Sequence, residues 1–333
     1  MQSLKKMSST AEDINCHSVE PSRTVTSLST DVCTDLLESP RSLPPKYFYD
    51  ERGSLLFDRI CTTPEYYPTR KEDKLLQQYA EQIISSTLPE HIIELGSGSS
   101  RKTRRLFDAC ANLEHHCSYA PFDVCEPMLK QAASELSLDY DWLEIDPLVG
   151  DYHAGLENLP RAKATNLFIF LGSTIGNFSP DEATDFLQDL RNCMSKGDFF
   201  LVGADRVKDT DVLNAAYNDA QGLTAEFNLN VLNVINRELG SNFDIDKFRH
   251  QANFNSELSR IEMRLIALEE QDVNFDLLKR TAHLKKGESI LTEISRKFKA
   301  NEIETMLINQ GFEVVEHFQM EDEYFSLLLV SAI

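Results

Sequence analysis

The sequence predicts an α/β protein built on a doubly wound, Rossmann-like sheet, and three observations support that class. Short apolar runs alternate with amphipathic helical patterns between residues 71 and 203, as parallel strands with crossover helices require. A glycine turn, Gly96 to Gly98, follows the first apolar run, and Asp123 ends the second. Two further strand patterns, at residues 312–318 and 324–333, predict a terminal antiparallel hairpin at the sheet edge.

The chain before the first core strand divides into distinct segments. Residues 1–30 are polar, rich in Ser and Thr and without the apolar centre of a signal peptide, so a disordered tail is expected. A helix is expected at residues 30–37, before prolines interrupt the chain. The aromatic-rich residues 46–70 are compatible with core or lid packing or with the wall of a ligand site. Residues 71–86 have the periodicity of an amphipathic helix.

The glycine turn carries the first functional signal. Ile92 and Ile93 predict a strand, and a helical pattern at residues 101–111 follows the turn. Glycines adopt backbone angles closed to other residues and let a ligand approach the main chain. An acid at the tip of the next strand, here Asp123, suits a ribose diol. The dinucleotide pattern is broken, because Arg101 stands where its third glycine belongs. The spacing instead resembles that of S-adenosylmethionine (SAM) methyltransferases of the Rossmann-like class.

The alternation continues to about residue 203. After a helix at residues 126–136, Asp151 follows a short apolar run and suits either the exocyclic amine of adenine or a helix cap. Residues 166–171 predict a central strand buried on both faces, with Gly172 at its carboxyl end. Asn177 either takes a left-handed turn conformation or offers its amide to a substrate's amine or carboxylate. A helix at 181–194 and a strand at 198–203 complete the series.

A long segment then interrupts the alternation. Roughly 90 residues lie between the last of these strands and a predicted helix at 299–310. They contain helical patterns at 210–217 and 225–239 and strand patterns at 260–269 and 281–284. This stretch is too long for one crossover, so we expect an inserted α+β domain that shares its core with the N-terminal aromatic segment. We predict that residues 31–60 and 208–297 form a substrate-binding domain and that residues 61–207 and 298–333 form the methyltransferase domain.

Composition excludes several functions. The chain has 333 residues, 41% hydrophobic and 26% charged, with a formal net charge of −21. That charge argues against nucleic acid and anionic membrane surfaces as partners, and the sequence contains no apolar run of membrane-spanning length. The seven cysteines are scattered and predict reduced thiols in a cytoplasmic protein. No metal site is predicted, and a monomer is expected.

Six motifs together resemble the histidine-specific Nα-methyltransferases that make hercynine, the first step of ergothioneine biosynthesis. The resemblance runs from about residue 44 to the end of the chain. The motifs are residues 44–50 (PPKYFYD), 53–58 (GSLLFD), 64–70 (PEYYPTR), 94–98 (ELGSG), 170–178 (FLGSTIGNF) and 292–295 (TEIS).

The resemblance implies roles for individual residues. SAM is the implied cofactor and L-histidine the implied substrate. The residues implied to bind SAM are Gly96, Lys102, Asp123, Asp151, Tyr152 and Gly172. Those implied to hold the amino acid's amine and carboxylate are Tyr66, Asn177 and Tyr217, and Tyr49 and Phe57 wall the space of methyl transfer. Tyr49 and Asn177 are the implied catalytic residues.

The same resemblance assigns Glu293 and Ser295 to the imidazole ring. Two residues apart on a strand point to the same face, so a carboxylate and a hydroxyl could grip both ring nitrogens. The alternatives are a methyltransferase for another amino acid, such as tryptophan or a modified histidine, and a non-catalytic SAM- or metabolite-binding module. Indole has one donor and no acceptor nitrogen, which disfavours tryptophan.

Overall fold

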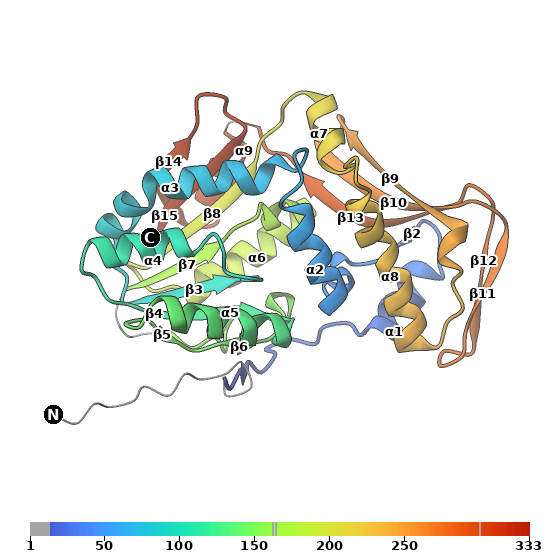
Figure 1. Cartoon of the computed structure of the whole chain (residues 1–333), viewed down its shortest axis with the longest axis horizontal. Coiled ribbons are helices and arrows are strands. Elements are labelled where there is room, and N and C mark those ends of the chain that lie inside the picture. The colour runs from blue at the N-terminus through green and yellow to red at the C-terminus, as the bar shows by residue number, and fades with distance from the viewer. Residues whose placement is uncertain (1–13, 162, 164, 300) are drawn as a thin grey trace.

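Two lobes lie side by side in the protein (Figure 1). A computed structural model describes residues 14–161, 163, 165–299 and 301–333. One lobe contains the large sheet and the other a smaller sheet, and helix α2 (Glu51–Ile60) lies between them.

The large sheet has the doubly wound order that the sequence predicts. Among the described residues it has nine strands in the order β1-β6-β4-β3-β7-β8-β15-β14, with β5 paired to β4. Strands β6, β4, β3, β7 and β8 run parallel, whereas β15 is antiparallel to β8 and β14. The strands are β1 (His17–Ser18), β3 (His91–Leu95), β4 (Ser118–Asp123), β5 (Glu144–Ile145), β6 (Leu148–Val149), β7 (Asn166–Phe170), β8 (Phe199–Asp205), β14 (Phe312–Gln319) and β15 (Phe325–Ala332). The predicted α/β class and terminal hairpin are confirmed.

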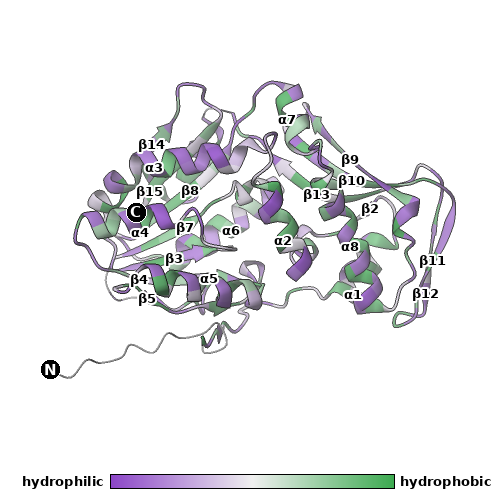
Figure 2. Ribbon diagram, in the orientation of Figure 1, coloured by the Kyte–Doolittle hydropathy of each residue, from purple (hydrophilic) through white to green (hydrophobic). Residues whose placement is uncertain are grey.

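Helices cover both faces of this sheet because its strands bury both faces. Ile92 belongs to the core on one face and Ile93 to the core on the other, and the central strands are accordingly hydrophobic (Figure 2). One face packs against α3 (Tyr67–Thr87), α4 (Arg104–Asn112) and α5 (Glu126–Asp139), and the other against α6 (Pro180–Cys193) and α9 (Glu302–Asn309).

The second lobe is built from two separate parts of the chain. Its sheet has the order β2-β13-β10-β9, and a hairpin of β11 and β12 extends beyond it. The strands are β2 (Arg41–Ser42), β9 (Phe248–Asn255), β10 (Arg260–Ala267), β11 (Gln271–Phe275), β12 (Arg280–Leu284) and β13 (Ser289–Arg296). The helices here are α1 (Leu28–Asp31), which continues into the π-helix η2 (Val32–Leu36), and α2, α7 (Thr210–Ala216) and α8 (Leu223–Leu239). Two short 3-10 helices, η3 (Pro45–Phe48) and η6 (Ile245–Lys247), complete this lobe.

The core of the second lobe combines the N-terminal aromatic segment with the segment after β8. Its buried side chains come from residues 32–67 and 213–290. Tyr66 and Tyr67, on the far side of the expected boundary at residue 61, pack into this core as well. Residues 271–275, for which the sequence suggested no element, form β11.

The segment before residue 31 differs from the expected disordered tail wherever the structure describes it. Residues 17 and 18 pair with β6 as strand β1, and the Val19 N–H donates to the Val149 carbonyl at 2.9 Å. The Arg23 guanidinium lies 2.6 Å from the Asp189 carboxylate. These contacts use mainly backbone groups, so polar composition gave no sign of them. Residues 1–13 lie outside the described part of the chain.

None of the helices in the described ranges combines the length and the apolar character that a bilayer crossing requires.

Candidate active site

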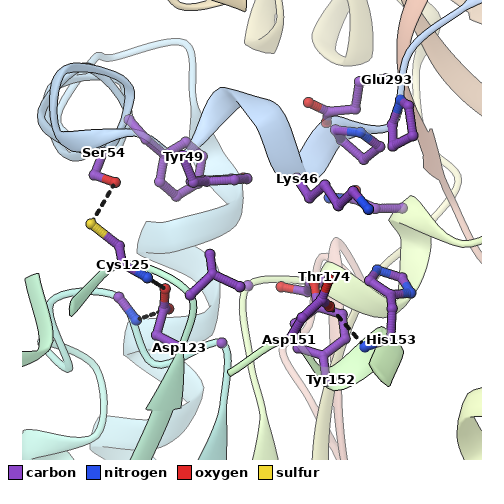
Figure 3. A pocket seen from close by; sticks show the side chains of 18 of the residues that line it. Lys46, Tyr49, Ser54, Asp123, Cys125, Asp151, Tyr152, His153, Thr174 and Glu293 are labelled. Carbon is purple, nitrogen blue, oxygen red and sulfur yellow. Dashed lines mark hydrogen bonds between the residues drawn. The ribbon is translucent and has the colours of Figure 1, made fainter. Parts of the chain in front are cut away.

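A cavity of about 700 Å³ opens at the carboxyl ends of β3, β4 and β7 and is closed on its other side by the second lobe. Figure 3 shows Asp123, Asp151 and Tyr152 on one side of it and Tyr49 and Glu293 on the opposite side. All the site residues that the sequence predicted line this one cavity: Tyr49, Phe57, Tyr66, Gly96, Lys102, Asp123, Asp151, Tyr152, Gly172, Asn177, Tyr217, Glu293 and Ser295.

The glycine turn after β3 forms the floor of the cavity. Gly96 and Gly98 have φ values of 66° and 50°, a left-handed conformation that glycine adopts without strain. The Gly96 N–H donates to the Phe122 carbonyl at 2.8 Å, which ties the turn to β4. The Ser97 hydroxyl between them is buried and has no hydrogen-bond partner among the described residues. Ser97 lines the cavity, so an unpaired and buried hydroxyl lies at its floor.

Two carboxylates stand at the tips of neighbouring strands. Asp123, at the end of β4, accepts from the N–H groups of Gly98 at 2.9 Å and Cys125 at 3.0 Å. Burial raises the pKa of Asp123, and the same two N–H donors oppose that rise. Asp151 accepts from the His153 N–H at 2.8 Å and caps η4 (Tyr152–Ala154). Asp151 caps a turn and also lines the cavity, so the two interpretations of this residue, a helix cap and a contact with adenine, do not exclude each other.

Aromatic rings of the second lobe form the opposite wall. Ring centroids are 5.8 Å apart for Tyr49 and Phe57, 6.1 Å for Phe57 and Tyr66, and 6.0 Å for Tyr66 and Tyr217, each pair meeting edge to face. Burial raises the pKa of Tyr49, Tyr66 and Tyr217. These phenols are therefore neutral at physiological pH. Tyr49 and Tyr66 can donate hydrogen bonds into the cavity, whereas the Tyr217 hydroxyl donates to Ser295 at 2.9 Å.

Strand β13 brings Glu293 and Ser295 to the same wall. Burial raises the pKa of Glu293 to about 7, although Lys297 opposes the rise. The Ser295 hydroxyl lies 2.9 Å from the Tyr217 hydroxyl and 3.0 Å from the Lys297 ammonium. The turn that carries Asn177, η5 (Thr174–Asn177), packs directly on this strand, because a β-carbon on Gly176 would lie 2.8 Å from the Arg296 carbonyl oxygen.

A family model described as "Histidine-specific methyltransferase, SAM-dependent" matches residues 28–332. The chain belongs to this family. It is an enzyme, a SAM-dependent methyltransferase, and the predicted resemblance and the predicted cofactor are confirmed.

Individual relatives agree with the family. The methyltransferase is 44% identical over 284 residues to Histidine N-alpha-methyltransferase of Mycolicibacterium smegmatis, covering 85% of this chain and 88% of that protein. It is 35% identical over 208 residues to Ergothioneine biosynthesis protein 1 of Neurospora crassa, covering 61% of this chain and 24% of that protein. It is 26% identical over 323 residues to 4-dimethylallyltryptophan N-methyltransferase of Claviceps purpurea, covering 90% of this chain and 92% of that protein.

The floor of the cavity fits SAM. SAM has a ribose diol that a carboxylate such as Asp123 can bind, and an adenine amine that can donate to Asp151. The Ser97 hydroxyl, which has no partner among the described residues, is a further polar atom at this floor. The cavity volume of about 700 Å³ lies within the range of small-molecule sites.

The sequence analysis missed Glu72, which contacts two cavity-lining residues, Gly172 and Lys102. It is fully buried in α3, and its carboxylate accepts from the Gly172 N–H at 2.8 and 2.9 Å and pairs with the Lys102 ammonium. Gly203 makes room for it, since a β-carbon there would lie 1.9 Å from a Glu72 oxygen. A signal was present, because Glu72 occupies the apolar stripe that Leu75, Leu76 and Ile83 define.

Proposed function

We propose that this methyltransferase adds three methyl groups to the α-amine of L-histidine and releases hercynine, the first step of ergothioneine biosynthesis. One observation carries the proposal: Glu293 and Ser295 face the same cavity as the glycine turn, from the opposite lobe. A carboxylate and a hydroxyl together complement the two ring nitrogens of imidazole. The Histidine N-alpha-methyltransferase of M. smegmatis supports the same reaction by its name and its 44% identity.

The roles on the cofactor side follow from the chemistry of each group. Bound SAM supplies an electrophilic methyl group. We assign Asp123 to the ribose hydroxyls and Asp151 to the adenine amine, with Tyr152 beside the ring. Gly96 and Gly172 leave the main chain open to the cofactor, and Lys102 is held at the cavity by Glu72.

The second lobe holds and desolvates the amino acid. We assign Tyr66, Asn177 and Tyr217 to the amine and carboxylate of histidine. The Tyr66 phenol can donate, the Tyr217 oxygen can accept from the amine because its own proton is held by Ser295, and the Asn177 amide both donates and accepts. Tyr49 and Phe57 exclude water from the space between amine and cofactor. Alignment and desolvation of this kind lower the barrier of a displacement without covalent help from the protein.

Proton release requires no buried base. The amine must lose one proton before each transfer. The reference pKa of a peptide α-amine is near 8 and that of a free amino acid is higher, so a fraction of the amine is neutral at cellular pH. The tyrosines keep their protons, as their raised pKa values require, so water is the acceptor. The quaternary ammonium of the product is attracted to the faces of the ring wall.

We propose a division of the chain into two domains along the predicted boundaries. We assign residues 31–60 and 208–297 to the substrate-binding domain and residues 61–207 and 298–333 to the methyltransferase domain, with Tyr66 and Tyr67 contributing to the core of the former. A single chain supplies both walls of the cavity, which supports a monomer as the working unit.

An amino-acid panel with labelled SAM tests the proposed reaction. Histidine should become the labelled amino acid, and mass spectrometry should detect a product heavier by about 42 Da, the mass of three CH₂ units. Tryptophan and its derivatives are the relevant competitors, given the relative from C. purpurea. Labelling of another amino acid in place of histidine would assign a different substrate, and no labelling would favour a binding module.

Substitution of Glu293 by alanine tests the imidazole assignment. The KM for histidine should rise about 10- to 100-fold, because the ring N–H loses a charged acceptor, and preference for histidine over other amino acids should fall. Glu313→Ala serves as the control, since Glu313 is an exposed strand residue on β14. If Glu293→Ala kept the wild-type preference for histidine over other amino acids, the Glu293 carboxylate would not be the group that binds the imidazole ring.

A further inference from the structure

A buried lysine follows β13 and has no role in the reaction described above. Lys297 is 1% exposed, and its ammonium nitrogen has three neighbours: Asp205 Oδ2 at 3.0 Å, Tyr217 Oη at 2.9 Å and Ser295 Oγ at 3.0 Å. An ammonium group has three donors and no acceptor. Each of these contacts therefore has one direction, from Lys297 to its neighbour.

The surroundings keep Lys297 charged. Burial disfavours the ammonium, but Asp205 and Tyr217 outweigh that effect and hold the pKa of Lys297 above its ordinary value. Burial likewise disfavours the Asp205 carboxylate, yet Lys297 and Lys208 hold its pKa below its ordinary value. The pair stays ionised, so a neutral amine that could accept a hydrogen bond does not form.

A charged Lys297 dictates the direction of the next hydrogen bonds. Tyr217 accepts from Lys297, and its own hydroxyl donates to Ser295 at 2.9 Å. The Ser295 oxygen thus accepts from both Tyr217 and Lys297, which occupies both of its lone pairs. Within the described part of the chain no contact uses the Ser295 proton, and this hydroxyl lines the cavity.

We propose that Lys297 is a positioning residue that fixes Ser295 as a hydrogen-bond donor toward the cavity, so that the site selects a neutral imidazole with its bare nitrogen at Ser295 and its N–H at Glu293. The inference rests on the proposed function and deepens it. Glu293, two residues earlier on the same strand face, supplies the acceptor. An imidazolium has N–H groups at both positions and an indole has no acceptor nitrogen. Either ring leaves one of the two protein groups without a correct partner.

Two histidine analogues isolate the Ser295 bond. Pyrrol-2-yl-alanine and pyrrol-3-yl-alanine each keep one ring N–H and replace the other nitrogen by CH, so neither can accept from Ser295 when its N–H meets Glu293. Calorimetry on the full chain gives dissociation constants for histidine and for the better-bound analogue. The wild-type protein should prefer histidine by about tenfold or more, because the analogue leaves a buried hydroxyl unpaired.

The preference should disappear when Ser295 is released. In Lys297→Met, Tyr217 no longer receives the lysine's bond, so the Ser295 hydroxyl can turn and donate to it. The ratio of the two dissociation constants should then fall to within about threefold of unity. Lys208→Met is the matched control: Lys208 pairs with the same carboxylate, Asp205, but contacts neither Tyr217 Oη nor Ser295. Its ratio should equal that of the wild-type protein.

Each outcome has a defined meaning. If Lys297→Met binds both ligands more weakly by the same factor, so that the ratio is unchanged, Lys297 acts only on stability and the inference is overturned. If circular dichroism shows that Lys297→Met does not fold, Ser295→Ala decides, because a retained preference there excludes Ser295 as the donor. A wild-type protein that neither binds nor methylates histidine refutes the proposed function instead, whatever the ratio in the variants.

Discussion

Glu293 is a carboxyl group placed where its ionised form is costly. It is 9% exposed in a wall of aromatic rings, and burial raises its pKa to about 7. In the proposed complex the ring N–H of histidine replaces the lost solvent. Without that ligand, ionisation of Glu293 works against the folded state, which makes the stability of the free protein depend on pH.

The sign of that dependence follows from linkage. A carboxyl group whose pKa is raised on folding contributes stability below its ordinary pKa, near 4.5, and this contribution is lost as the pH rises through about 7. Between pH 5 and pH 8 the ligand-free protein should therefore lose up to about 3 kcal/mol through Glu293. Glu293→Gln removes this titration, so its free energy of unfolding in urea should decline less over the same interval.

A matched variant separates this effect from the other carboxyl groups. Burial also raises the pKa of Glu94 to about 7, but Glu94 is present in both proteins and its contribution cancels in the comparison. Glu313→Gln, at an exposed site, should retain the full wild-type slope. Equal slopes for the wild-type protein and Glu293→Gln would show that Glu293 stays ionised in the free cavity.

The sequence predicted the residues that line the cavity better than the buried residues that hold them in place. Glu293 and Ser295 could be predicted because both belong to the motif at residues 292–295 and lie two residues apart on a predicted strand. Lys297 continues the same spacing, but its contacts with Asp205 and Tyr217 depend on how distant segments meet. Such contacts have no local pattern, so only the structure reveals them.

Among the elements, α3 supports the cofactor side of the cavity through Glu72, a residue that does not itself line the cavity. Its Glu72 accepts from the Gly172 N–H and pairs with Lys102, and so connects the loops that follow β3 and β7. Glu72→Gln places amide N–H groups against these donors and leaves Lys102 without its counterion. We expect a loss of about 2–3 kcal/mol in the free energy of unfolding and about tenfold weaker binding of SAM.

Urea unfolding and calorimetry with SAM measure the two effects. Glu81→Gln is the control, because Glu81 is exposed on the same helix. A variant as stable as the wild-type protein, with unchanged SAM affinity, would mean that the loops hold their positions without α3.

Elements with strong periodicity were predicted well, and those defined by pairing were not. Helices α3, α5 and α6 and strands β4 and β7 follow their apolar patterns closely. By contrast, β1 has two exposed residues and exists because its backbone pairs with β6. Strand β11 exists through its pairing with β12, and alternation over its five residues is too short to be distinctive.

For the molecule as a whole, the two lobes are joined through a buried ionic cluster. Asp205 ends β8 of the large sheet, and Lys297 follows β13 of the smaller one. The Asp205 carboxylate also accepts from the Tyr67 hydroxyl at 2.7 Å and pairs with Lys208. One carboxylate therefore balances two buried ammonium groups at the junction beside the cavity.

Asp205→Asn tests whether this cluster holds the lobes in register. The variant keeps the size of the side chain but leaves two buried lysines without a counterion, so the free energy of unfolding in urea should fall by about 3–5 kcal/mol. Because Lys297 orients Tyr217 and Ser295, histidine binding should weaken as well, whereas SAM binding should change less. Asp246→Asn, at an exposed site on η6 in the second lobe, should alter neither quantity by more than about 0.5 kcal/mol. If Asp205→Asn were as stable as that control, the other contacts between the lobes would hold them together, and the ionic cluster would serve only to orient the substrate side of the cavity.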